Sequence, residues 1–375
     1  MVAAASVVVA VGTATGMMSA LDDGRGRSEE ARPEVTDSPT LDLRPPAPSP
    51  SPSVTESPSP SAIPKKRPAS PAPSPTRTEK KQRTAAASTR LYRHSASQVL
   101  DWVRDNPGDA RQDVIRSRIA DQPAAVWFAD YTPATITARV RAVTSGGAAQ
   151  GRVPVVVAYG IPDRDCGGAS QGGAPDLDAY DAWIDRFAAG LGSGEVVVIL
   201  EPDAIAQTDC LSAGQRADRF ASLARAGRTF KDANPKARVY FDAGHSGWHP
   251  AAKQADLLRQ AGAGSAASSD GVFSNVSNFH RTADEIAYDR RVLDALGGPA
   301  SLGAVIDTSR NGNGAPPDGE WCDPDGRKLG RAPTLNTGEA RIDGYLWVKL
   351  PGESDGCKGS PGTFTPSYAY ELASP

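Results

Sequence analysis

Seven short runs of β-branched and other apolar residues constrain the fold of this chain more than any other feature. Between most of them, apolar residues recur at helical spacing, as in residues 180–187. Strands that alternate with helices predict a parallel sheet with crossover helices. The runs lie at residues 126–129, 153–160, 196–201, 238–244, 271–278, 302–308 and 345–350.

Two of these runs, residues 155–157 and 196–200, are apolar at every position. A strand without a polar face is buried on both sides, which is typical of an α/β barrel or of a doubly wound sheet. The sequence has no internal repeat that would favour a solenoid. The expected fold class is therefore α/β, and the pattern alone leaves the choice between these two architectures open.

Polar and acidic side chains follow the C-terminal ends of six successive predicted strands. In parallel α/β folds this edge is where active sites are built. A single acid at such a place is more often a helix cap or an ion-pair partner, but six strand ends together predict a site rich in carboxylates. The residues are Asp163, Arg164 and Asp165, Glu201 and Asp203, Asp242, Asn275 and Asn278, Asp307 and Arg310, and Glu353 and Asp355.

Several carboxylates in one cleft suit glycoside hydrolysis, which needs one acid to protonate the leaving oxygen and a second group to activate water or attack. Crowded like charges raise the pKa of one carboxyl and keep it protonated near neutral pH. Aromatic side chains near the same strand ends could bind the apolar faces of sugar rings, although packing in the core is an equally good explanation for each. They are Trp127, Tyr159, Trp248 and Trp321.

Other kinds of site fit less well. His245 and His249 are four residues apart, a zinc spacing on a helix, but the sequence around them predicts a strand-to-loop exit. The glycine-rich residues 167–173 lack the Lys-Ser/Thr pair of a phosphate loop and predict a flexible loop at the cleft edge. We therefore expect no metal and no cofactor. The net charge of −3 gives no reason to expect a nucleic-acid partner.

The N-terminal part has a different composition. Residues 1–21 form an apolar stretch without charge before Asp22, which predicts a signal peptide or a signal anchor. Residues 22–90 are rich in Pro and Ser and predict a disordered linker. The folded domain is then expected at residues 91–375. A secreted protein, or one tethered to the membrane through its N-terminus, is the expected result.

All four cysteines lie in the predicted folded domain. An even number in an exported chain predicts two disulfides, for which the spacing allows three connectivities. The chain has no Cys-x-x-Cys pair, which argues against a zinc ribbon. The residues are Cys166, Cys210, Cys322 and Cys357.

Taken together, the motifs resemble glycoside hydrolase family 6, the inverting β-1,4-endoglucanases and cellobiohydrolases. The resemblance covers the chain from Leu91 onward. It is carried, in family order, by Val-Ala-Tyr-Gly-Ile-Pro-Asp-Arg-Asp-Cys (157–166), Leu-Glu-Pro-Asp (200–203), Tyr-Phe-Asp-Ala-Gly-His-Ser-Gly-Trp (240–248), Asp-Thr-Ser-Arg-Asn-Gly-Asn-Gly (307–314), Glu-Trp-Cys (320–322) and Leu-Trp-Val-Lys-Leu-Pro-Gly-Glu-Ser-Asp-Gly-Cys (346–357).

The resemblance implies a distorted parallel (β/α) barrel of about seven strands. It implies that Asp203 is the general acid, that Asp165 tunes it and positions the water, that Asp355 is the base and that Tyr159 lies beside the reacting sugar. It pairs the cysteines as 166–210 and 322–357. Substrate-binding roles are implied for Trp127, Asp242, His245, Trp248, Asn278, Arg310, Trp321, Lys349 and Glu353, with Asp242 as structural or electrostatic support.

The expected activity is internal cleavage of β-1,4-glucan by a monomer. Family members that work from chain ends roof their clefts with long loops, and Asp355-Gly356-Cys357 leaves no room for one of these loops. Residues 165–178 are too short and too rich in Gly and Ala to form the other half of a roof. The alternatives are an exo-acting cellobiohydrolase and a non-catalytic glucan-binding or wall-binding protein on a stalk.

Overall fold

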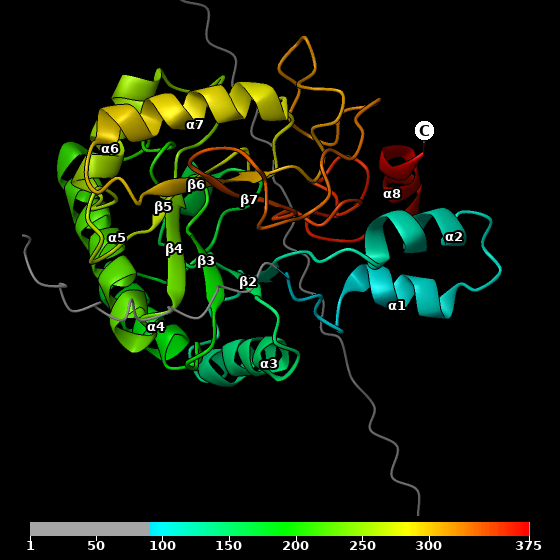
Figure 1. The fold of residues 1–375 in the computed structure, drawn as a ribbon, viewed down its shortest axis with the longest axis horizontal. Helices are drawn as coiled ribbons and strands as arrows, with labels where there is room; N and C mark the ends of the chain where they lie inside the picture. The colour runs from blue at the N-terminus through cyan, green and yellow to red at the C-terminus, as the bar shows by residue number, and fades with distance from the viewer. Residues whose placement is uncertain (1–89, 375) are drawn as a thin grey trace, which may run out of the picture. The chain divides into compact units, whose positions relative to one another are not determined.

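A parallel seven-stranded sheet, curled into an open barrel, forms the centre of the fold (Figure 1). The computed structural model describes residues 90–374. Each strand pairs with the next one along the chain, so the spatial order is β1 to β7. The strands are β1 Val126–Phe128, β2 Val155–Ala158, β3 Val196–Leu200, β4 Ala237–Asp242, β5 Gly271–Ser274, β6 Gly303–Asp307 and β7 Ile342–Leu346.

The sequence prediction of seven parallel strands and an α/β barrel is thus confirmed, and the doubly wound alternative is excluded by the sequential strand order. The last strand begins earlier than predicted, at Ile342, and Val348 to Leu350 lie beyond its end. Val348 and Leu350 pack in apolar clusters of the domain, so a strand and a buried loop have the same apolar signal in the sequence here.

Between the described residues of β1 and β7 no ladder of hydrogen bonds forms, and we refer to this gap in the barrel as the seam. Two hydrogen bonds cross near it. Ala125 N donates to Trp347 O at 2.9 Å, and the indole Nε1 of Trp127 donates to Val348 O at 2.7 Å. The barrel is therefore closed by loop contacts rather than by strand pairing.

Five helices surround the sheet in Figure 1, and they follow β1 to β5 in turn. Each buries one apolar side, and Trp183 and Phe187 of α4 are fully buried in the main core. None of the helices in residues 90–374 is both long and apolar enough to cross a bilayer. The five are α3 Ile136–Ala149, α4 Leu177–Ala188, α5 Ala213–Ala233, α6 Ala251–Gln260 and α7 Thr282–Leu296.

A second group of helices lies together at the right of Figure 1. They share an apolar cluster that includes Val99, Ile115, Trp347 and Ala369, so the two ends of the domain pack together. These elements are α1 Gln98–Asp105, α2 Gln112–Ile115, the π-helical turn η1 Arg116–Ala120 and α8 Pro366–Ala373. The predicted segments 1–21 and 22–90, apart from residue 90, lie outside the described residues.

The C-terminal edge of the sheet carries several non-glycine residues in the left-handed backbone conformation. Glu201 has φ 51°, Asp203 φ 69° and Asn275 φ 65°. Such residues cost free energy and persist only where surrounding contacts hold them. The fully buried Glu201 carboxylate supplies such contacts, because it accepts hydrogen bonds from Gly160 N at 2.9 Å and Ile161 N at 3.0 Å. The turn that presents Asp203 is thereby fixed to the end of β2.

Candidate active site

A large hollow of about 1350 Å³ opens at the C-terminal edge of the sheet, beside the seam. It brings together eleven of the thirteen residues with predicted catalytic or substrate-binding roles. The other two are buried behind its wall: Arg310 donates a hydrogen bond to Asp355, and the charge of Asp242 acts on Asp203. The lining residues are Trp127, Tyr159, Asp165, Asp203, His245, Trp248, Asn278, Trp321, Lys349, Glu353 and Asp355.

Asp203 follows β3 and reaches the wall of this hollow. Burial raises the pKa of its carboxyl well above the usual value, and the neighbouring charges of Asp242 and Asp165 raise it further. Asp242 is itself held in place, because its Oδ2 accepts hydrogen bonds from Ile205 N at 3.2 Å and Ala206 N at 3.0 Å. Asp203 can therefore carry a proton at a pH where an ordinary aspartate has lost it.

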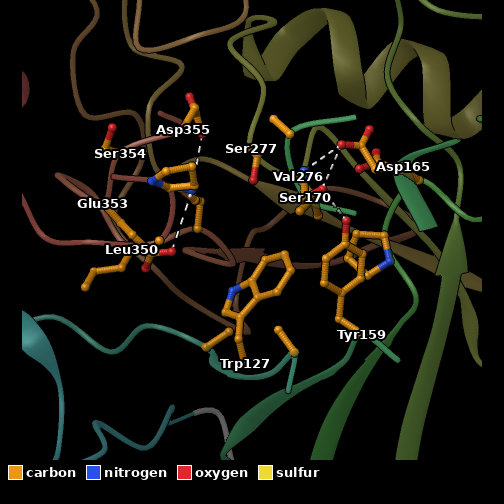
Figure 2. A pocket seen from close by; sticks show the side chains of 18 of the residues that line it. Trp127, Tyr159, Asp165, Ser170, Val276, Ser277, Leu350, Glu353, Ser354 and Asp355 are labelled. Atoms are coloured by element: carbon orange, nitrogen blue, oxygen red, sulfur yellow. Dashed lines mark hydrogen bonds and ion pairs between the residues drawn. The ribbon is translucent and has the colours of Figure 1, made fainter. Parts of the chain in front are cut away.

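Asp165, Ser170 and Tyr159 form a hydrogen-bonded group on one side of the hollow (Figure 2). Asp165 Oδ2 accepts from Ser170 N at 2.8 Å and from Ser170 Oγ at 3.1 Å, and Ser170 Oγ lies 2.8 Å from the Tyr159 hydroxyl. The Arg164 guanidinium lies 4.3 Å from the centre of the Tyr159 ring and donates to Ala129 O at 2.8 Å. This group holds a carboxylate and a hydroxyl at fixed positions in the cleft.

Asp355 lies on the other side, with Glu353, as Figure 2 shows. Two cations hold it. Arg310 Nη1 donates to Asp355 Oδ2 at 2.7 Å, and Lys349 Nζ lies 3.2 Å from Oδ1. Lys349 Nζ is also 3.7 Å from Glu353 Oε1. Burial raises the pKa of Glu353 despite this lysine. Asp165 on one side of the hollow thus faces Asp355 and Glu353 on the other side, with Trp127 between the two sides.

The model for "Glycosyl hydrolases family 6" matches residues 81–371. The chain belongs to this family. It is 54% identical to "Endoglucanase 1" of Streptomyces sp. (strain KSM-9) over 77% of this chain and 79% of the relative. It is 50% identical to "Endoglucanase A" of Thermobispora bispora over 77% of this chain and 62% of that protein.

Among solved structures, the fold matches the endoglucanase Cel6 from Mycobacterium tuberculosis, which was solved in complex with methyl-cellobiosyl-4-deoxy-4-thio-β-D-cellobioside. The TM-score is 0.70 and the sequence identity 40%, over 76% of this chain and 97% of that structure. The family 6 membership that the motifs implied is thus confirmed.

The family 6 site includes a residue that the sequence analysis did not select, Asp323. Its buried carboxylate accepts from Asp355 N at 2.8 Å, Cys357 N at 3.0 Å and Lys358 N at 2.9 Å, as well as from the Ser354 hydroxyl. Burial alone would raise the pKa of Asp323, but these hydrogen bonds outweigh it and lower the pKa to about 2. Asp323 therefore fixes the backbone that carries Asp355.

Ser170 and Arg164 were also not selected as site residues. Ser170 stands in the stretch interpreted from its glycines as a flexible loop, and Arg164 was noted only as one polar residue at a strand end. The one local signal for Ser170 in the sequence is that it is a polar residue five positions after Asp165. Its link to Tyr159 is visible only once the loop has folded back over β2.

Aromatic groups of this family 6 cleft lie where the sequence analysis expected them. Trp127 stands edge-on to Tyr159, with ring centres 5.3 Å apart. His245 lies 5.4 Å from Trp248 and stacks on His280 at 4.3 Å. Burial, followed by the neighbouring histidines, lowers the pKa of His245 to about 3, so the ring is neutral.

The remaining predicted residues complete the rim. Trp321 is 56% exposed, which leaves its ring face open to the cleft. Asn278 Nδ2 donates to Val276 O at 3.2 Å. The Nε2 of His249 lies 3.0 Å from Ala206 O. Within residues 90–374 no group of three or more side chains is arranged to hold a metal ion.

The four cysteines form two disulfides, Cys166–Cys210 and Cys322–Cys357, in the pairing that the resemblance implied. The first ties the segment of Asp165 to the loop after Asp203. The second ties the segment of Asp323 to that of Asp355. Each therefore joins two segments that carry carboxylates of the cleft.

Proposed function

We propose that this chain hydrolyses β-1,4-glucosidic bonds in the interior of glucan chains, with inversion at the anomeric carbon. The observation that carries the proposal is Asp203, a buried carboxyl whose pKa is raised well above its usual value and which shares one cleft with Asp165 and Asp355. The relatives named as endoglucanases, at 42–54% identity over most of the chain, support the same activity.

In this proposal Asp203 gives its proton to the glycosidic oxygen as the bond to the anomeric carbon breaks. Water attacks that carbon from the opposite face and loses a proton to a carboxylate. Asp165, fixed by Ser170, positions the water and raises the proton affinity of Asp203. Asp355 is the proposed base, and it forms ion pairs with Arg310 and Lys349.

The proposed inversion has a direct chemical readout. An inverting site keeps its acid and base carboxyls about 6.5–9.5 Å apart, which leaves room for a water molecule between base and sugar. We therefore expect the α-anomer as the first product from a β-linked cello-oligosaccharide. Proton NMR during the first minutes, before mutarotation, measures it. An initial excess of β-anomer would instead require a retaining mechanism with a covalent intermediate.

The substrate in this proposal is a β-1,4-glucan chain that lies along the cleft. Trp127, Trp248 and Trp321 supply flat faces for successive sugar rings, and the neutral His245 and Asn278 supply polar groups between them. Lys349 and Glu353 are positioned to bind hydroxyls near Asp355. Asp242 and Arg310 act from behind the wall, the first on Asp203 and the second on Asp355.

Internal cleavage is expected because the cleft is open. Trp321 is more than half exposed at its rim, and Gly167, Gly168 and Ala169, which also line the hollow, are exposed as well. We expect the viscosity of carboxymethyl-cellulose to fall steeply while few reducing ends appear. A slow fall, with cellobiose as the main early product, would support the exo-acting alternative. Failure to release any reducing sugar would support a non-catalytic glucan-binding protein.

We further propose that the enzyme works outside the cell as a monomer. Disulfides persist in oxidising compartments, and this domain has two. The predicted signal or anchor at residues 1–21 and the linker at 22–90 would export the domain and, if residues 1–21 are retained, tether it to the membrane. The mass of the mature N-terminus distinguishes the secreted form from the tethered one.

A further inference from the structure

The hollow also has a part that the mechanism does not use, lined by segments next to α1, β1 and the second disulfide. Its walls there include Arg93 and His94 before α1, Gln122 between η1 and β1, and Gly362 in the loop after the second disulfide. These segments contribute no carboxylate to the lining, in contrast to the reaction centre. We call this part, defined by Arg93, His94, Gln122 and Gly362, the outer end. Its polar groups are amide, guanidinium and imidazole groups instead of carboxylates.

Hydrogen-bonding groups at the outer end are partly unused. Arg93 is exposed and commits one guanidinium nitrogen, which donates to Ala120 O at 3.2 Å. No hydrogen bond from the Gln122 side chain to another described residue is present, although its amide offers donors and an acceptor together. His94 keeps a buried Nδ1 without a partner among the described residues. Burial lowers the pKa of His94, which keeps its ring neutral.

The backbone around these groups is held in place. Gln98 uses both ends of its amide across the outer end: Nε2 donates to Gly362 O at 2.8 Å, and Oε1 accepts from Phe364 N at 2.8 Å. On the other side, Tyr92 N donates to Val153 O at 2.7 Å, which joins the Arg93 segment to the start of β2. A wall fixed in this way can present these side chains to a ligand without the further cost of ordering the backbone.

We propose that the outer end binds an additional glucosyl unit of the substrate, beyond the unit that lies on Trp127. Amide, guanidinium and imidazole groups match sugar hydroxyls, each of which both donates and accepts. The proposal rests on the proposed function, because the glucan chain must already lie along the cleft. It makes Arg93 and Gln122 residues that select longer chains, through contacts remote from the bond that is cut.

Contacts that form equally in the ground state and the transition state change KM and leave kcat nearly constant. We therefore expect kcat/KM of the wild-type enzyme to rise along the series from cellotriose to cellohexaose until the outer end is filled. Gln122→Ala and Arg93→Ala should each reduce the ratio of kcat/KM between cellohexaose and the shorter substrates by about three- to tenfold, the range of one or two hydrogen bonds. The loss should appear in KM.

Arg228→Ala is the matched control, because Arg228 is exposed on α5 and does not line the hollow. Thermal unfolding checks that each variant is folded. If Gln122→Ala and Arg93→Ala both keep the wild-type ratio of kcat/KM, or lose kcat equally on oligosaccharides of every length, the proposed outer subsite is overturned. The proposed hydrolase activity is not affected by that result. If the wild-type enzyme cleaves none of these oligosaccharides, the proposed function itself fails.

Discussion

Asp203→Asn is expected to lower turnover of unactivated glucan by about 10²–10⁴-fold, the usual contribution of a general acid. The amide keeps the shape of the side chain but has no proton to give to the glycosidic oxygen. In the wild-type enzyme the rate should fall as pH rises through the raised pKa of Asp203, because the acid is then lost. The variant should lack this alkaline limb.

The same variant should be more stable than the wild-type protein at neutral pH. A carboxyl with a raised pKa in the folded state binds its proton more tightly there than in the unfolded chain. Its effect on stability is absent below the unfolded pKa of about 3.9, and stability falls as pH rises above it. Asparagine removes this penalty, so the difference in Tm between variant and wild type should grow from pH 4 towards pH 7.

Two measurements distinguish the loss of the general acid from a general disturbance of the fold. A substrate with a good leaving group needs little protonation and should be cleaved by Asp203→Asn with a much smaller loss than unactivated glucan. Asp209→Asn, at an exposed aspartate of the same loop, is the matched control and should change neither rate nor Tm appreciably. Equal losses on both substrates would show that Asp203 is not the acid.

Arg310→Met is expected to reduce the free energy of unfolding by about 3–5 kcal/mol, since it removes one of the two cations paired with the buried Asp355. Arg310 is fully buried, and it donates to Asp355 at 2.7 Å and to the Tyr368 hydroxyl at 3.2 Å. Its guanidinium also lies 4.5 Å from the centre of the Phe279 ring. Methionine fills similar space but cannot neutralise Asp355 or the nearby Asp323.

Urea unfolding measures this loss, and Arg225→Met provides the control. Arg225 pairs with Asp185 at 2.8 Å, but both side chains are substantially exposed. Exposed pairs contribute at most about 1 kcal/mol, so the control should lose far less. Similar losses in the two variants would mean that Arg310 stabilises the fold through packing contacts and not through its charge.

The strands and the principal carboxylates could be predicted from sequence because both are local signals. Residues 196–200 are apolar at every position, and burial on both faces follows directly. Asp165, Asp203 and Asp355 stand directly after strands or within recognisable motifs. In a parallel sheet, strand order alone then brings such residues to one edge.

The contacts that hold these carboxylates could not be predicted in the same way. Asp323 reaches Asp355 across 32 positions of sequence, and Arg310 does so across 45. The residues next to Asp323 and Arg310 in the sequence give no sign that these two side chains hold Asp355 in place. Asp242 and Arg310 also show that proximity to a strand end does not reveal whether a side chain lines the cleft or lies behind it, because that depends on how the neighbouring loops pack.

The seam has a consequence for how such a cleft can change. Residues 167–171, 361 and 362 line the hollow beside it, and the loops that contain them, 167–173 and 357–364, belong to no strand of the sheet. Lengthening a surface loop costs little, about 0.6 kcal/mol for each doubling of its length. Insertions there could cover the groove without disturbing a single strand pair. Related enzymes can therefore differ in whether they cleave chain interiors or chain ends at nearly constant stability, since the strand pairing of the sheet stays the same.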